Sequence, residues 1–194
     1  MCEALQGGES EQRLVRRLQG GDMAAFDVLF ERFRRELLAF TVGLLGDRTD
    51  AEDVVQESFV ALAARIRHLD PEQGVKAWLY RVARNRAIDR LRKRKWSVFP
   101  GCTFFRRQAR PERAGDRAPG ESAARADTFA RLRDALDRLP EREREVLLLR
   151  YYSDLAFREI AGIVGRPMGT VLWQARRGVE RLREMQKDAG DELF

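Results

Sequence analysis

Apolar residues recur every three or four positions along most of this chain, on both sides of one stretch that contains three prolines. That spacing matches the 3.6-residue turn of a helix rather than the two-residue repeat of a strand. The stretch itself, Ser97 to Ala126, also holds three glycines and has no sustained period, which is typical of a linker. The sequence therefore predicts an all-α chain in which two small helical domains are joined by a flexible basic linker.

The predicted domains are residues 1–96 and 127–194, with the linker at 97–126. In the first domain two consecutive helices are expected to bury thick apolar faces. Their expected ends are set by Gly20 with Gly21, an Asp22 cap, Gly43 with Gly46, and a capping box at Thr49 and Glu52. The expected inward residues of this domain are Leu14, Val15, Leu18, Phe26, Leu29, Phe30, Phe33, Leu37, Phe40, Val55, Phe59, Leu62 and Ile66.

The most basic predicted helix, Ala77 to Trp96, carries eight basic side chains and a single acid. Its buried side is predicted to hold Leu79, Tyr80, Ala83, Ala87 and Leu91. Its other side is predicted to hold Trp78, Arg81, Asn85, Asp89 and Arg92. That side fits either a solvated face with some charge pairing or a nucleic-acid surface, where arginines bind phosphates and an aromatic or amide contacts bases. The RKRK run after Leu91 favours nucleic acid, because one acid does not balance it.

The end of the chain has the pattern of a helix-turn-helix. Pro140 is predicted to start a helix that buries Val146, Leu147 and Leu149 and breaks at YYSD. Two further helices follow, FREIAGIVG and MGTVLWQARRGVERLRE, with the small Ala161 at their crossing and Gly165 at the turn. The second would enter a DNA major groove. Its expected core residues are Val171, Ala175, Val179 and Leu182, and arginines on or beside it are Arg166, Arg176, Arg177, Arg181 and Arg183.

Charge and composition exclude several classes of function. The net charge of +6 and the pI near 9.9 fit a polyanionic partner. The sequence has no apolar run of membrane-spanning length, and its first residues lack the features of a signal peptide. Cys2 and Cys102 are far apart and form no CxxC, which predicts a reducing, cytoplasmic location and no metal site. His68 is the only histidine and no catalytic motif is present, so neither an enzyme nor a cofactor is expected.

Four segments together resemble a known family. DAEDVVQESF, AWLYRVARNRAIDRLRKRK, LDRLPEREREVLLLRYY and FREIAGIVGRPMGTV are similar, in this order, to motifs of bacterial extracytoplasmic-function (ECF) sigma factors. The resemblance covers about Leu18 to Arg183, apart from the linker. It implies a region 2 helical bundle and a region 4 helix-turn-helix. It also implies a transcription initiation factor that binds core RNA polymerase and directs it to bipartite promoters, reading the −35 element as duplex and the −10 element as a melted single strand.

The resemblance also implies roles for individual residues. Polymerase binding is assigned to Asp53, Gln56 and Glu57. Contact with the −10 element is assigned to His68, Trp78, Arg81, Asn85, Asp89 and Arg92, and the loop His68 to Gly74 would capture a flipped base. Contact with the −35 element is assigned to Arg166, Thr170, Trp173, Gln174 and Arg177. The implied partners are the clamp of the largest polymerase subunit, the flap of the second, promoter DNA and an anti-sigma factor.

The sequence departs from the family pattern after GTV, where Leu172, Trp173 and Gln174 replace the usual basic residue, Ser and Arg. The change removes charge-assisted phosphate contacts. Either the −35 sequence is atypical, with Gln174 contacting adenine, or duplex binding is weak and another factor helps. Trp173 could instead belong to the core. A milder departure is Asp154, where glycine is common, and it is expected to cap the following helix.

Two other functions stay open on the sequence alone. One is a DNA-binding regulator that uses only the helix-turn-helix and dimerises through its N-terminal helices. It leaves the Asp53, Gln56 and Glu57 face unexplained. The other is a protein that binds polymerase, no longer reads promoters and acts by competition, and the Leu172 to Gln174 change is the feature that keeps it open.

Overall fold

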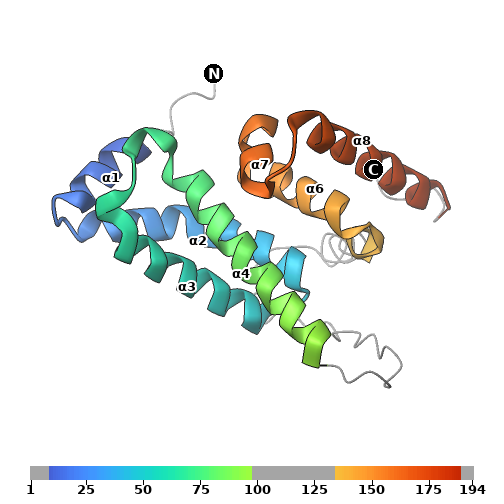
Figure 1. Cartoon of the computed structure of the whole chain (residues 1–194), viewed down its shortest axis with the longest axis horizontal. Helices are drawn as coiled ribbons and strands as arrows, with labels where there is room; N and C mark the ends of the chain where they lie inside the picture. Colours follow the sequence, from blue (N-terminus) through green and yellow to red (C-terminus); the bar gives the residue numbers. More distant parts are fainter. Residues whose placement is uncertain (1–8, 98–133, 189–194) are drawn as a thin grey trace, which may run out of the picture.

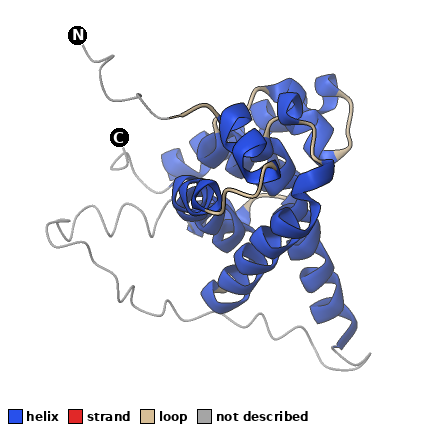
Figure 2. Cartoon of the chain, turned by 90° about the vertical axis from the view of Figure 1, so that its left-hand side faces the viewer, coloured by secondary structure: helices blue, strands red, loops and turns tan. Residues whose placement is uncertain are grey.

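The computed structural model describes residues 9–97 and 134–188, and within these ranges every regular element is a helix (Figures 1 and 2). The predicted all-α fold is confirmed. The helices are α1 (Glu11–Gln19), α2 (Ala24–Leu45), α3 (Arg48–Arg65), α4 (Val75–Ser97), α6 (Glu141–Ser153), α7 (Phe157–Val164) and α8 (Met168–Asp188), with short 3-10 turns η1 (Ile66–His68) and η2 (Pro71–Gln73). The predicted linker from residue 98 onward, both cysteines, Phe129 and Leu132 lie outside the described residues.

Helices α1 to α4 form the N-terminal half, in which α2 lies at the centre and contacts each of the other three. The predicted inward residues are buried, except that Phe26, Phe30 and Leu91 are only partly covered. Phe30 packs edge-on against Phe59 with ring centroids 4.8 Å apart. The 3.6-residue pattern thus located this core correctly, because each helix buries one stripe against α2.

Two predicted helix starts are wrong by a few residues. Asp47, rather than Thr49, is the N-cap of α3, and its carboxylate accepts from the Asp50 amide at 2.9 Å. The cap prediction failed because Asp47 offers an equally good acceptor two residues earlier. Met23 holds the N-cap position of α2, although Asp22 still accepts from the Ala24 amide at 3.1 Å.

The predicted end of α2 at Gly46 is confirmed, whereas Gly43, the other glycine expected to close it, lies inside the helix, which continues to Leu45. A Cβ at Gly43 would lie 2.8 Å from a methyl group of Leu148, so the missing side chain is what allows α6 to approach α2. Tyr80 of α4 adds a hydrogen bond from its hydroxyl to the Tyr152 carbonyl at 3.0 Å. The C-terminal half, α6 to α8, therefore packs on α2 and α4, and one continuous core joins both halves (Figure 1).

Within the C-terminal half, α7 and α8 form the predicted helix-turn-helix, and Gly165 adopts φ 67° at the turn. Asp154 ends α6 in the left-handed conformation, φ 50°, and does not cap α7. Glycine suits that conformation, which explains the family preference at this position. The break accordingly comes at Asp154, after Tyr151 and Tyr152 have continued the helix.

Three predicted core positions in this half are not buried as expected, and one of them is Leu182, which is only partly covered. Leu148 is buried on α6 in place of Leu147, which is only partly buried. Val179 is 38% exposed, because the inward face of α8 is formed by Val171, Gln174, Ala175 and Gly178. Across residues 9–97 and 134–188, none of the helices has the length and apolar character that crossing a membrane requires.

Candidate functional site

The predicted polymerase-binding residues Asp53, Gln56 and Glu57 lie together on the exposed side of α3. Arginines of α4 border them: Arg86 donates to Glu57 at 2.7 Å, and Arg90 donates to Glu57 at 2.7 Å and to Asp53 at 3.3 Å. Partial burial raises the pKa of Glu57, but the hydrogen bonds from Arg86 and Arg90 outweigh it and hold that pKa below its ordinary value. Glu57 is therefore held by α4 in its ionised form.

The predicted −10 residues of α4 form an outer face opposite its buried stripe. Arg81, Asn85, Asp89 and Arg92 are exposed, whereas Trp78 is half-buried against the core. Asn85 accepts from Arg84 at 3.2 Å through its side-chain oxygen, and Asp89 pairs with Arg92 at 3.6 Å. The structure thus brings four of these residues onto one accessible surface and leaves Trp78 at its edge.

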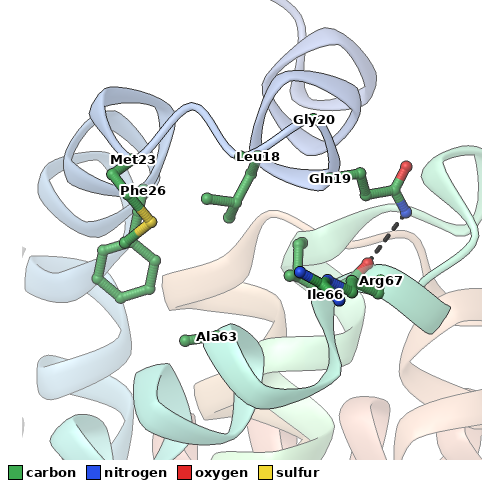
Figure 3. Close-up of a pocket in the computed structure, with 9 residues that line it drawn as sticks. Leu18, Gln19, Gly20, Met23, Phe26, Ala63, Ile66 and Arg67 are labelled. Carbon is green, nitrogen blue, oxygen red and sulfur yellow. Dashed lines mark hydrogen bonds between the residues drawn. The ribbon is translucent and has the colours of Figure 1, made fainter.

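The loop from His68 to Gly74 is held by α1, which the sequence analysis did not anticipate. The Gln19 amide donates to the carbonyls of Ile66 and Leu69, at 3.0 and 2.8 Å, beside a shallow pocket where α1 and α2 meet the end of α3 (Figure 3). Gln12 and Arg16 bond the Glu72 carboxylate at 2.9 and 3.0 Å. His68 itself is exposed. A sequence pattern could not reveal these contacts, because they join residues about fifty to sixty positions apart.

Glu145 is a second feature that sequence reasoning missed. Its side chain is 4% exposed and binds guanidiniums from both halves, Arg84 at 2.5 Å and Arg166 at 2.8 Å. The alternating EREREV sequence looks like a solvated surface, so nothing in it indicated a buried carboxylate. Arg166 is consequently turned inward and is not part of the outer face of α8.

The outer face of α8 is formed by Thr170, Trp173, Arg176 and Arg177. Trp173 is 57% exposed, so its assignment to the core is not supported, and the Arg177 guanidinium lies 6.0 Å from its ring centroid. Glu180 pairs with Arg176 at 3.0 Å and with Arg177 at 3.5 Å. The hydrogen bond from Arg176 is the main cause of a lowered pKa at Glu180.

Gln174 does not lie on this face. It is 4% exposed and accepts from Arg166 at 3.1 Å through its side-chain oxygen. The expected adenine contact is therefore not supported in this arrangement, because the amide is buried and bonded to Arg166. Position 174 falls between Val171 and Ala175 on the buried side of the 3.6-residue repeat.

An apolar groove runs between α6 and α8 on another side of the C-terminal half. It is lined by the apolar side chains of Leu147, Phe157, Leu172, Ala175 and Val179 and by the charged residues Arg150, Arg176, Glu180 and Arg183. An exposed apolar surface bordered by polar residues is typical of a binding site.

Comparison with known proteins identifies the family of this chain. Residues 29–97 match the model of Sigma-70 region 2, and residues 129–182 match the model of Sigma-70 region 4. The ECF RNA polymerase sigma factor RpoE of Cereibacter sphaeroides is 30% identical over 164 residues, which cover 84% of this chain and 87% of that protein. The chain belongs to the ECF sigma factor family. It is accordingly a transcription initiation factor that binds RNA polymerase and promoters, and it is not an enzyme.

Other similar proteins agree with this assignment. SigW of Bacillus subtilis is 27% identical to this sigma factor over 185 residues, covering 91% of the chain and 97% of that protein. The sigma factor RpoE of Bartonella quintana, solved in complex with the anti-sigma factor NepR, superposes with a TM-score of 0.66 at 25% identity, covering 86% of this chain and 98% of that one. CnrH, solved with the cytosolic domain of CnrY, shares the fold, with a TM-score of 0.70 at 24% identity over 94% and 100% of the chains.

Proposed function

We propose that this sigma factor contacts core polymerase through α3 and reads a bipartite promoter through α4 and α8. The acidic face of Asp53, Gln56 and Glu57 would bind the clamp of the largest subunit. The outer face of α4, with the loop His68 to Gly74, would hold the melted −10 strand, and the outer face of α8 would read the −35 duplex. The predicted domains, residues 1–96 and 127–194, fit this division. The region 2 match covers residues 29–97 and the region 4 match covers residues 129–182.

One observation carries the proposal: the exposed residues of α4 stand opposite a fully buried stripe on the same helix. Leu79, Ala83 and Ala87 fix the helix in the core, so Arg81 and Asn85 are presented on a rigid support. Guanidiniums bind phosphates, and an amide and an indole edge can contact unstacked bases. The chemistry suits a single strand, and the acidic neighbour α3 suits a protein target rather than DNA.

The groove between α6 and α8 supports contact with the polymerase flap. The apolar side chains and arginines that line it fit an apolar segment flanked by acidic residues. Val179→Glu would add a charge to this lining, and we expect it to weaken holoenzyme assembly. Holoenzyme that assembles with wild-type affinity in this variant would exclude the groove as the flap site.

An anti-sigma factor is a proposed regulatory partner. The Bartonella quintana relative, which is 25% identical, was solved with one. Co-purification from the native host, followed by mass spectrometry, tests for such a partner of this chain.

Run-off transcription from a randomised promoter library, with purified core polymerase and with or without this chain, tests the function directly. Discrete start sites that require the chain would support promoter reading. Arg81→Ala and Asn85→Ala should each reduce those transcripts about tenfold or more, since one base contact corresponds to about 1–3 kcal/mol. Arg35→Ala, an exposed arginine on α2, is the matched control and should leave them unchanged.

The remaining outcomes separate the rival functions. If the chain binds core polymerase but initiates nowhere, even on its own genomic fragments, it competes for polymerase instead of initiating. Gln56→Ala and Glu57→Arg should weaken core binding, and the control Glu31→Arg should not. If both α3 variants bind core polymerase as well as the control does, the α3 face is not the clamp-binding surface.

A further inference from the structure

Trp173 lies at the centre of the outer face of α8, where a residue can reach base edges. Thr170 and Arg177 lie three and four residues away from it on the same side of the helix. A Cβ at Gly169, the other neighbour on this side, would meet no atom within 4 Å, so nothing in the described chain covers the indole from there. The largest side chain on this face is therefore apolar and accessible.

The guanidiniums around Trp173 form ion pairs within the protein. Arg176 and Arg177 both pair with Glu180, and Arg166 pairs with the buried Glu145. Gln174, the residue with a bidentate amide, is turned into the core. Around Trp173 this surface thus lacks the bidentate amide that would contact adenine, and its two exposed guanidiniums share Glu180.

The remaining apolar feature in a major groove is the C5-methyl group of thymine. From the position and exposure of this indole we infer that Trp173 determines the −35 sequence by contacting thymine methyl groups. Arg177, whose guanidinium lies over the ring, positions the indole and keeps a donor available for the adjacent phosphate. The inference rests on the proposed reading of the −35 duplex by α8.

An apolar helix face could instead bind protein. We favour DNA because the indole stands on the second helix of a helix-turn-helix, with a hydroxyl and two guanidiniums around it, whereas the apolar protein-binding groove lies on another side of α8. The two faces share Arg176 at their border.

The test uses holoenzyme and a −35 duplex from the promoters that the library yields. Each thymine is replaced in turn by deoxyuridine, which removes one methyl group and keeps the hydrogen-bonding groups. At one or two positions we expect wild-type affinity to fall about fourfold, the factor that corresponds to one methyl group removed from water. Trp173→Ala should bind more weakly and bind thymine and uracil duplexes equally, and Trp173→Phe should keep part of the discrimination.

Tyr151→Ala is the matched control, because Tyr151 is an exposed aromatic on α6, away from this face, and its loss should leave the thymine-to-uracil ratio unchanged. Equal affinity for thymine and uracil duplexes at every position in the wild type would overturn the inference and leave −35 reading intact. Discrimination that persists in Trp173→Ala would also overturn it. Holoenzyme that initiates from the −10 element but shows no affinity for any −35 duplex would overturn both the inference and the proposed role of α8.

Discussion

Glu145 of α6 accepts a hydrogen bond from Arg84 of α4 at 2.5 Å, and this carboxylate is buried between the two halves of the molecule, with Arg84 15% exposed. Its other oxygen pairs with Arg166 at 2.8 Å, so one carboxylate binds two guanidiniums. Breaking a buried ion pair by removing one partner costs far more than losing an exposed pair, because the remaining charge stays buried.

Glu145→Ala should therefore lower the free energy of unfolding by about 3 kcal/mol. Glu145→Gln, which keeps the shape and one acceptor, should cost less. Denaturation followed by circular dichroism measures both. The control is Glu52→Ala, whose exposed pair with Arg48 should be worth about 0.5 kcal/mol. A Glu145→Ala effect no larger than that of the control would contradict the role assigned to this carboxylate.

Gly43→Leu should force α2 and α6 apart, because even a Cβ there would lie 2.8 Å from Leu148. We expect a loss of about 1–3 kcal/mol from overpacking. Leu148→Ala in the same chain should relieve the clash, so the double variant should be more stable than the sum of the single effects predicts. Urea unfolding of all four proteins measures this coupling.

Gly169→Leu serves as the comparison, since a side chain at Gly169 meets open space. It should not destabilise the chain. Additive effects of Gly43→Leu and Leu148→Ala would show that the two positions do not share the same space.

Arg90→Ala should change how stability depends on pH. The lowered pKa of Glu57 contributes stability that is fully present above the ordinary value near 4.5 and is lost as pH falls through the folded-state value. The variant has a smaller contribution, so its Tm should lie below that of the wild type near neutral pH and approach it in acid. Arg34→Ala, which loses an exposed pair with Glu31 and a cation–π contact with Phe30, should show a smaller gap. A difference in Tm between wild type and Arg90→Ala that grows as pH falls would contradict this role of Arg90.

Gln19→Ala should loosen the loop His68 to Gly74, because the carbonyls of Ile66 and Leu69 lose their donor. The expected cost is about 1–3 kcal/mol if the carbonyls stay buried. Under the proposed role of this loop, promoter opening should slow, as measured by 2-aminopurine fluorescence in the −10 element, while core binding is unchanged. Gln186→Ala near the end of α8 is the control. Opening at the wild-type rate in Gln19→Ala would exclude the loop as a rate-limiting contact.

Much of the fold followed from periodicity alone. The buried stripes of α2, α3 and α4 and the helix-turn-helix were predicted correctly, because a helix with one apolar side must bury that side. Helix ends were less certain, since Asp47 and Thr49 are both good caps and only the backbone decides between them.

The contacts between the halves could not be predicted. Gly43 reads as a helix end and Glu145 as a surface acid, and each takes its real role only when a residue distant in sequence, Leu148 or Arg84, comes next to it. The exposed residues of α3 and α4 could be predicted from the sequence, because helical spacing determines which residues share a face. The burial of Gln174 could not be predicted from helical spacing alone, since it depends on the hydrogen bond by which Arg166 stabilises that amide in the interior.

The continuous core between α2, α4 and α6 also limits affinity in general. A partner that needs the two halves apart binds only the fraction of molecules that are open, so its apparent Kd exceeds the intrinsic Kd by the inverse of that fraction. Each 1.4 kcal/mol of stability in the contact of Gly43 with Leu148, or of Arg84 with Glu145, corresponds to about a tenfold loss. That factor is the same for every promoter sequence, so these residues set how much of the sigma factor is needed and leave the choice of promoter to others.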